Sequence, residues 1–187
     1  MRYFTSDWHL NEDRIGVNGK PNLFYRPFPS TYEQRYHILD KFSDIFHNGD
    51  ELYHLGDVVY SLTEETYRLD IYFRDNFFKM YPDSKLTLIK GNYDDDKIDY
   101  LSKIFHEIVE DRTIEIKGRE YYLNHYPTKC INKEFSLTGH IHGLWKVQKN
   151  MINVGVDAWH FRPVSEDEID FCRTACEKHY DKHVFPY

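Results

Sequence analysis

Two histidines stand one residue apart in the segment "SLTGHIHGLW", where His140 and His142 follow a short apolar run that ends in Gly139. Imidazoles at the end of a strand can bind a metal ion, or they can simply lie in a solvated turn. Imidazole and carboxylate groups together are ligands for borderline divalent ions. If these histidines bind metal, other segments must bring carboxylates and further histidines to the same place.

Each predicted core strand does end in an Asp, Asn or His. The carboxyl ends of strands are where open α/β sheets build their sites. The set contains no thiolate, so a closed structural zinc site is not expected. It is too large for one tetrahedral ion and suits two metals that share a carboxylate, although each residue taken alone could equally cap a turn. The candidate ligands are Asp7, His9, Asp57, Asn92, His125, His140 and His142.

The elements that position these residues alternate between strand and helix in the first half of the chain. Apolar segments at 2–6, 51–57 and 85–91 are typical of strands, the last ending at Gly91. The segments between them have helical period. The first expected helix begins at a Ser30–Glu33 capping box. The second runs from Thr63 to about Met80, and a third, short helix lies around Lys97–Phe105.

The second half changes to short strands. Residues 112–126 alternate with period two around Lys117-Gly118, which predicts a hairpin. Three further strands follow within 134–157, and a Ser165–Glu168 capping box opens a C-terminal helix. We expect this half to be mostly antiparallel. The whole pattern predicts an α/β fold of two packed mixed β-sheets flanked by helices, in one domain over 1–187, with a separate small β domain as the alternative.

Composition limits the classes of function. The 187 residues carry a net charge of −7, which argues against an extended nucleic-acid surface. No segment approaches the ~20 apolar residues of a membrane span. The N-terminus has no signal-peptide pattern, so we expect a cytoplasmic protein. The three cysteines are expected to be reduced and structural.

The order and spacing of the site motifs resemble those of the calcineurin-like metallophosphoesterases. The segments "RPF", "YHLGD" and "NVGVDAW" resemble the small single-domain bacterial and phage branch, and the resemblance extends from Met1 to about Ile169. Each motif is weak alone, but five in order, each ending a predicted strand, are specific. They are Asp7–His9 (D-x-H), Gly56-Asp57 (GD), "GNYD" at 91–94, the lone His125, and Gly139–His142 (G-H-x-H).

The resemblance assigns the candidate ligands to two divalent ions, with Mn²⁺ the first choice and Fe, Zn, Ni and Mg ions compatible. It implies a phosphoesterase that hydrolyses phosphodiesters in preference to monoesters, by means of a metal-bridging hydroxide, with catalytic roles for Asp57 and Tyr93. Asp7, His9 and His142 would hold one ion, Asn92, His125 and His140 the other, and Asp57 would bridge them.

Tyr93 departs from the commonest pattern of this superfamily, which has histidine at that position. A tyrosine can still donate a hydrogen bond to a phosphoryl or leaving oxygen. It is a weaker acid, with a reference pKa of about 10. We therefore expect activated or nucleotide-like leaving groups, or assistance from another group such as His160. Arg26 is a candidate to bind the substrate phosphate, with a surface arginine as an equal alternative.

Two rival functions remain open. One is a phosphomonoesterase that acts on small molecules or proteins. The other is a catalytically inactive metal-binding scaffold for protein interaction, which Tyr93 favours and the complete ligand set disfavours. Among the remaining residues, His54 is expected in the core or behind the ligands, and Asp157 is expected to pair with Arg162. The aromatic stripe Phe73, Phe77, Phe78 and Tyr81 would lie in the core or at a homodimer contact.

Overall fold

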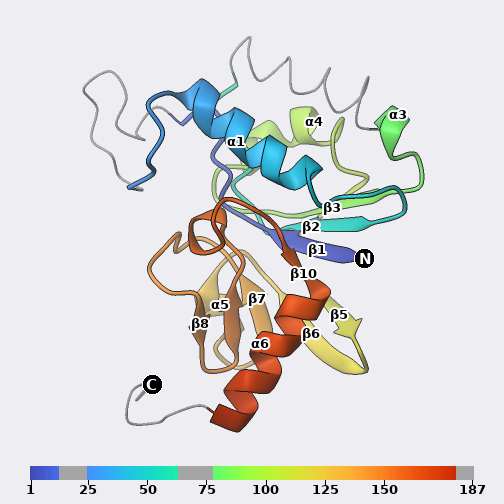
Figure 1. Cartoon of the computed structure of the whole chain (residues 1–187), viewed down its shortest axis with the longest axis vertical. Coiled ribbons are helices and arrows are strands. Elements are labelled where there is room, and N and C mark those ends of the chain that lie inside the picture. The colour runs from blue at the N-terminus through green and yellow to red at the C-terminus, as the bar shows by residue number, and fades with distance from the viewer. Residues whose placement is uncertain (13–24, 63–77, 180–187) are drawn as a thin grey trace.

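The computed structural model describes residues 1–12, 25–62 and 78–179 of the chain. Two five-stranded mixed sheets pack face to face, and helices cover their outer faces (Figure 1). The predicted α/β fold of two packed sheets is therefore confirmed. Most of the helix expected from Thr63, and Phe73 and Phe77 of the aromatic stripe, lie outside the described residues.

The first sheet has a parallel centre. Its order is β10-β1-β2-β3-β4, and only the edge strand β10 runs antiparallel to its neighbour. Three of its strands match predicted segments, whereas β4 and β10 were not predicted. The strands are β1 (Arg2–Thr5), β2 (Glu51–His54), β3 (Lys85–Ile89), β4 (Glu107–Val109) and β10 (Val164–Ser165).

The second sheet corrects one expectation. Its order is β5-β6-β7-β9-β8, and the hairpin β5–β6 turns at Lys117-Gly118 as predicted. The central strands β6, β7 and β9 are parallel, not antiparallel, because the chain crosses over between them instead of turning back. The strands are β5 (Arg112–Ile116), β6 (Arg119–Leu123), β7 (Ser136–Thr138), β8 (Val147–Gln148) and β9 (Met151–Asn153).

Helices α1 and α6 begin at the two predicted capping boxes. Ser30 caps α1, its side chain accepting a hydrogen bond from the Glu33 amide, and Ser165 accepts one from the Glu168 amide. Figure 1 shows α1 on the outer face of the first sheet and α6 on that of the second. The helical segments are α1 (Thr31–Ser43), α3 (Phe78–Met80), η3 (Asp95–Lys97), α4 (Ile98–Leu101), α5 (Pro127–Cys130), η4 (Val156–Ala158) and α6 (Glu166–His179).

Alternation along the buried strands divides the core into two layers. Leu86 and Leu88 of β3 pack with Ile38 and Phe42 of α1, whereas Ile89 packs with residues of the second sheet. Successive side chains of a strand point to opposite faces, so a strand buried on both faces is apolar throughout. No helix in the described ranges has the length and apolar character that a membrane span requires.

Candidate metal centre

The predicted ligands lie where parallel strands of both sheets end. Asp7 follows β1, Asp57 follows β2 and Asn92 follows β3 in the first sheet. His125 follows β6 and His140 follows β7 in the second sheet. The parallel centre of the second sheet matters here, because an antiparallel pair would have sent its two histidines to opposite edges.

Backbone contacts beyond the strands join the two sheets at this edge. Ser6 pairs with Gly155 in a parallel bridge, and the Val156 amide donates to the Ser6 carbonyl at 3.1 Å. Within the first sheet, the Asp7 amide donates to the Gly56 carbonyl at 3.0 Å. The ligand-bearing loops are thus extensions of hydrogen-bonded strands, and rigid elements hold a site more precisely than free loops do.

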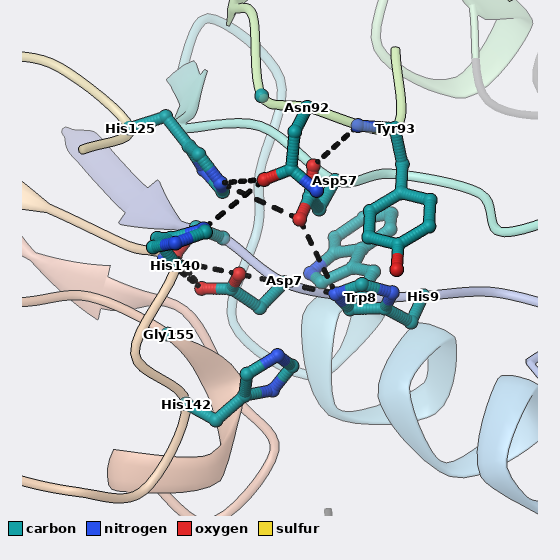
Figure 2. Close-up of polar contacts among 12 residues, drawn as sticks. Asp7, Trp8, His9, Asp57, Asn92, Tyr93, His125, His140, His142 and Gly155 are labelled. Atoms are coloured by element: carbon teal, nitrogen blue, oxygen red, sulfur yellow. Dashed lines mark hydrogen bonds and ion pairs between the residues drawn. The ribbon is translucent and has the colours of Figure 1, made fainter. Parts of the chain in front are cut away.

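The structure brings six of the seven predicted ligands into two groups. Within each group, one ligand atom per residue lies within 4.8 Å of the others. We call these the first group and the second group. Figure 2 shows His142 on the Asp7 side and His125 on the opposite side, with Asn92 beside His125 and His140. The first group is Asp7, His9 and His142, and the second group is Asp57, His125 and His140.

Asp57 lies between the two groups. Its Oδ2 atom is 3.4 Å from Nε2 of His9 and 3.4 Å from Nε2 of His125 (Figure 2). Its Oδ1 atom accepts a hydrogen bond from the Tyr93 amide at 3.0 Å. Burial opposes ionisation of this carboxyl, but hydrogen bonds from His125 and His9 outweigh burial and hold the pKa of Asp57 well below its usual range. One carboxylate thus faces histidines of both groups.

Asn92, the seventh predicted ligand, joins the histidines of the second group. Its Oδ1 atom lies 3.2 Å from Nε2 of His125 and 3.0 Å from Nδ1 of His140. Burial lowers the pKa of His125. The contact with Asp57 and the charge of Asp7 raise this pKa by more than burial lowers it, and the result is a pKa of about 9. Burial and the nearby His125 lower the pKa of the more exposed His140. In the absence of metal, a proton on His125 provides positive charge beside Asp57.

The backbone at the ligands is unusual. A non-glycine residue with φ above zero is uncommon, and such residues cluster at functional sites because tertiary contacts must hold them there. Asn, Asp and His tolerate this conformation better than β-branched residues do. Five of the seven predicted ligands adopt it: Asp7 (φ 58°), His9 (46°), Asp57 (60°), His140 (73°) and His142 (50°).

Glycines beside the ligands leave the space that these loops need. A Cβ on Gly139 would lie 2.3 Å from Ser6 Oγ and 2.8 Å from Asp7 Oδ2. A Cβ on Gly91 would lie 2.3 Å from Asp57 Oδ1. Real Cβ atoms do not approach other atoms so closely, so any side chain there would displace a ligand carboxylate. The glycines of "GNYD" and "GHIH" therefore allow close approach of neighbouring loops.

Asp94 is a site residue that the sequence analysis did not assign, although it ends the "GNYD" motif. It is fully buried, and its carboxylate accepts hydrogen bonds from the backbone amides of Asp57 (2.8 Å), Val58 (3.1 Å) and Gly91 (2.8 Å). Burial raises its pKa, although those three amides act in the opposite direction. Asp94 thus ties the loop after β2 to the loop after β3. An Asp that follows Gly by three residues was the signal available in the sequence.

Tyr93 lies beside His9 of the first group, and its roles in catalysis and substrate binding stay predictions. Its ring is 5.1 Å from that of His9 and 5.4 Å from that of Tyr60. Figure 2 shows the ring of Tyr93 beside His9. His160 is exposed, with φ of 57°, and no contact within the described residues joins it to the ligands.

Arg26 does not lie where a substrate-binding residue should. It is 1% exposed, and its guanidinium donates to Asp157 and to the carbonyls of Asp7 and Trp8. The expected Asp157–Arg162 pair is wrong, because Arg162 pairs with Glu168 instead. Burial opposes ionisation of Asp157, but Arg26 and His142 hold its pKa well below the usual range. Arg26 therefore supports the site from behind.

The donor set fits divalent cations. The two groups offer carboxylate oxygens and imidazole nitrogens, and Asn92 beside the second group adds an amide oxygen; these donors suit Mn²⁺, Fe²⁺ and Zn²⁺. Asp7, His9, Asp57 and His125 are at most 2% exposed, so cations there would be largely shielded from solvent. His140 and Asn92 are exposed, so the site opens to solvent on the side of the second group.

No family model and no curated protein matches the sequence. Among the solved structures that resemble it, the protein of unknown function AQ665 from Aquifex aeolicus is 27% identical, with a TM-score of 0.71. That alignment covers 91% of this chain and 98% of AQ665. The nuclease MPE from Pseudomonas putida is 16% identical, with a TM-score of 0.49 and coverage of 75% of this chain and 61% of the nuclease. The likeness to AQ665 supports the fold over nearly the full length of both chains.

Proposed function

We propose that this protein is a metal-dependent phosphoesterase of the calcineurin-like type, with phosphodiesters as the preferred substrates. The observation that carries the proposal is the pair of ligand groups that share Asp57. Asp57 lies 3.4 Å from a histidine of each group. Two cation sites a few ångströms apart are typical of enzymes that displace an oxygen at phosphorus. The order of the motifs in the sequence independently resembles that superfamily.

The residues of the chain divide the work of such a reaction. Divalent ions held by the two groups would supply Lewis acidity and a water acidic enough to act as a nucleophile near neutral pH. Asp57 orients both groups, and its contact with the Tyr93 amide holds the tyrosine beside them. The Tyr93 hydroxyl is suited to donate a hydrogen bond to a phosphoryl or leaving oxygen. The exposed side at Asn92 and His140 admits the substrate.

The expected kind of leaving group follows from the acid that the site provides. A hydroxyl with a reference pKa of about 10 is a poor proton donor to a strongly basic leaving group. Tyr93 is the polar side chain that replaces the usual histidine, and it lies against His9. We therefore infer that the substrates carry activated or nucleotide-like leaving groups.

Turnover of bis-p-nitrophenyl phosphate and of p-nitrophenyl phosphate with Mn²⁺ tests this proposal. We expect faster turnover of the diester, and a fall of about tenfold for Tyr93→Phe, equivalent to the loss of one hydrogen bond. Faster turnover of the monoester would favour the phosphomonoesterase. Bound metal with no turnover of either compound would favour the inactive scaffold. A Tyr93→His variant with much lower turnover and normal metal content would contradict the view of Tyr93 as the weaker acid.

A further inference from the structure

A buried ion pair lies directly behind the first group. Arg26 donates from Nε to Asp157 Oδ1 and from Nη2 to Asp157 Oδ2, both at 2.8 Å. The side chain of Arg26 is 0% exposed and that of Asp157 is 7% exposed. A two-point arginine–carboxylate contact fixes both groups in direction as well as distance. The carboxylate of Asp157 is therefore held in one orientation.

That carboxylate faces His142. Its Oδ2 atom accepts a hydrogen bond from His142 Nδ1 at 3.0 Å. The contact leaves Nε2 of the imidazole as the nitrogen available to the first group. A carboxylate behind a ligating histidine fixes the tautomer and the ring orientation, and it makes the histidine a stronger ligand.

Arg26 also holds the other side of the first group. Its Nη2 atom donates to the Asp7 carbonyl at 2.5 Å, and its Nη1 atom donates to the Trp8 carbonyl at 2.9 Å. Those carbonyls belong to the loop after β1 that carries Asp7 and His9. The pair therefore connects the first-sheet loop of the first group to His142, which comes from the second sheet.

The second group lacks an equivalent ion pair within the described residues. Behind His125, Nδ1 contacts the carbonyl of Leu55 at 2.6 Å, which is a neutral acceptor. His140 Nδ1 lies 3.0 Å from the amide oxygen of Asn92, which is also neutral. Among the residues that the structure describes, the charged support is thus confined to the first group.

We propose that Asp157 and Arg26 are positioning residues that strengthen binding of a divalent ion by the first group and leave the second group unaffected. The two groups then differ in affinity, and the first group fills before the second as the ion concentration rises. This inference rests on the metal-binding part of the proposed function and is independent of the substrate.

The test is calorimetric titration of the metal-free full-length chain with Mn²⁺. We expect two binding events in the wild type. In Asp157→Asn, the tighter event weakens by about tenfold to a hundredfold, the usual effect of losing a partner behind a ligand, and the weaker event stays unchanged. Equal loss of both affinities, or no loss of either, would overturn the proposal.

Double variants separate the two groups. Adding Asp157→Asn to His142→Ala should change Mn²⁺ binding no further, because the histidine that Asp157 positions is already missing. Adding Asp157→Asn to His140→Ala should weaken Mn²⁺ binding by the first group by the same factor as it does in the wild type. An additional loss in the His142→Ala background would contradict the assignment of Asp157 to His142.

Glu168→Gln provides the matched control. Glu168 contacts Arg162 through both carboxylate oxygens, at 2.5 and 3.0 Å, but it lies on α6. The Glu168→Gln variant, like Asp157→Asn, loses one carboxylate from an arginine pair. Its Mn²⁺ binding should equal that of the wild type. If both variants lose affinity equally, the effect is one of general stability and the proposal fails.

The imidazole nitrogen resonances of His142 provide a readout that does not depend on metal. In the metal-free wild type, we expect the proton of the neutral ring on Nδ1, and in Asp157→Asn we expect a mixture of tautomers. Unchanged nitrogen shifts in a folded Asp157→Asn variant would overturn the positioning role. If the wild type binds two Mn²⁺ ions but cleaves no phosphoester, the proposed function is wrong. That result would not contradict the positioning role of Asp157 and Arg26.

Discussion

His54 and His125 are both completely buried, one in the apolar layer under the first sheet and the other at the strand-end edge. The ring of His54 packs against Trp8 at 4.8 Å and Phe105 at 6.0 Å, and its nitrogens have no hydrogen-bond partner among the described residues. Burial lowers the pKa of His54 to about 3. The Asp57 contact and the charge of Asp7 overcome burial at His125 and raise its pKa to about 9.

The difference shows what distinguishes the edge from the core. Burial alone removes the proton from an imidazole, whereas a nearby buried carboxylate retains it. The edge therefore favours positive charge on a buried imidazole, whereas the apolar layer around His54 disfavours it. A region that stabilises a buried proton in this way is also suited to stabilise a metal cation. Four substitutions test this contrast, from the largest expected effect to the smallest.

Replacing Asp57 by Asn removes the carboxylate that faces both groups. We expect diester turnover to fall by more than about a hundredfold, since the loss exceeds that of a partner behind a single ligand. Both Mn²⁺ affinities should fall, as measured by calorimetry. Asp167→Asn, on the exposed surface of α6, is the control and should behave as the wild type. Normal turnover by Asp57→Asn would remove the basis of the proposed function.

Replacing His54 by Leu tests the core side of the contrast. With a folded-state pKa of about 3 and an unfolded value near 6.5, the unfolded chain binds more protons between these pH values, so stability falls as pH is lowered through that window. Within that window, the titration of His54 lowers the free energy of unfolding by about 1.4 kcal/mol for each pH unit of acidification. We expect urea unfolding of His54→Leu to lose that slope. His47→Leu, at a side chain 79% exposed, should retain it.

Replacing Gly139 by Ala tests the close packing of the edge. The new methyl group would lie 2.3 Å from Ser6 Oγ, so the loop that carries His140 must shift. We expect the free energy of unfolding to fall by about 1–3 kcal/mol and Mn²⁺ binding to weaken. Gly143→Ala is the matched control, because its Cβ would have one ordinary contact at 3.7 Å. Similar urea midpoints for both variants would argue against a tightly packed edge.

Replacing Ser30 by Ala should have the smallest effect. It removes the side chain that caps the first turn of α1, whose Ile38 and Phe42 pack in the core. We expect a loss of about 1 kcal/mol in the free energy of unfolding and unchanged Mn²⁺ affinity. A loss of metal binding in this variant would show that core and edge are not independent, and thermal melting with and without Mn²⁺ would detect it.

The residues of the edge could be predicted from the sequence because their signals are local. Gly91-Asn92 and Gly139-His140 pair a glycine with a ligand, and the structure shows that the glycine makes room for the loop. The capping boxes at Ser30 and Ser165 likewise fix the start of a helix within a few residues. In each capping box the interacting groups are near neighbours in the chain, whereas each glycine makes room for a residue that is distant in the chain, Ser6 or Asp57.

Features that depend on distant contacts could not be predicted in the same way. The direction of β7 relative to β6 depends on a crossover, which period-two alternation does not report. The partner of Arg26 is Asp157, which lies 131 residues away in the chain. The short edge strand β10 is defined by its pairing with β1 and has no pattern of its own.

The division of the ligands between the two sheets has a consequence for biosynthesis. His142 lies 135 residues after Asp7 in the chain (142 minus 7), so it is made later. Neither sheet alone carries all the residues of either group, so each group is complete only after the sheets have docked. Under the proposed function, metal uptake would thus report assembly of the two sheets, and a product truncated before His140 would lack residues of both groups.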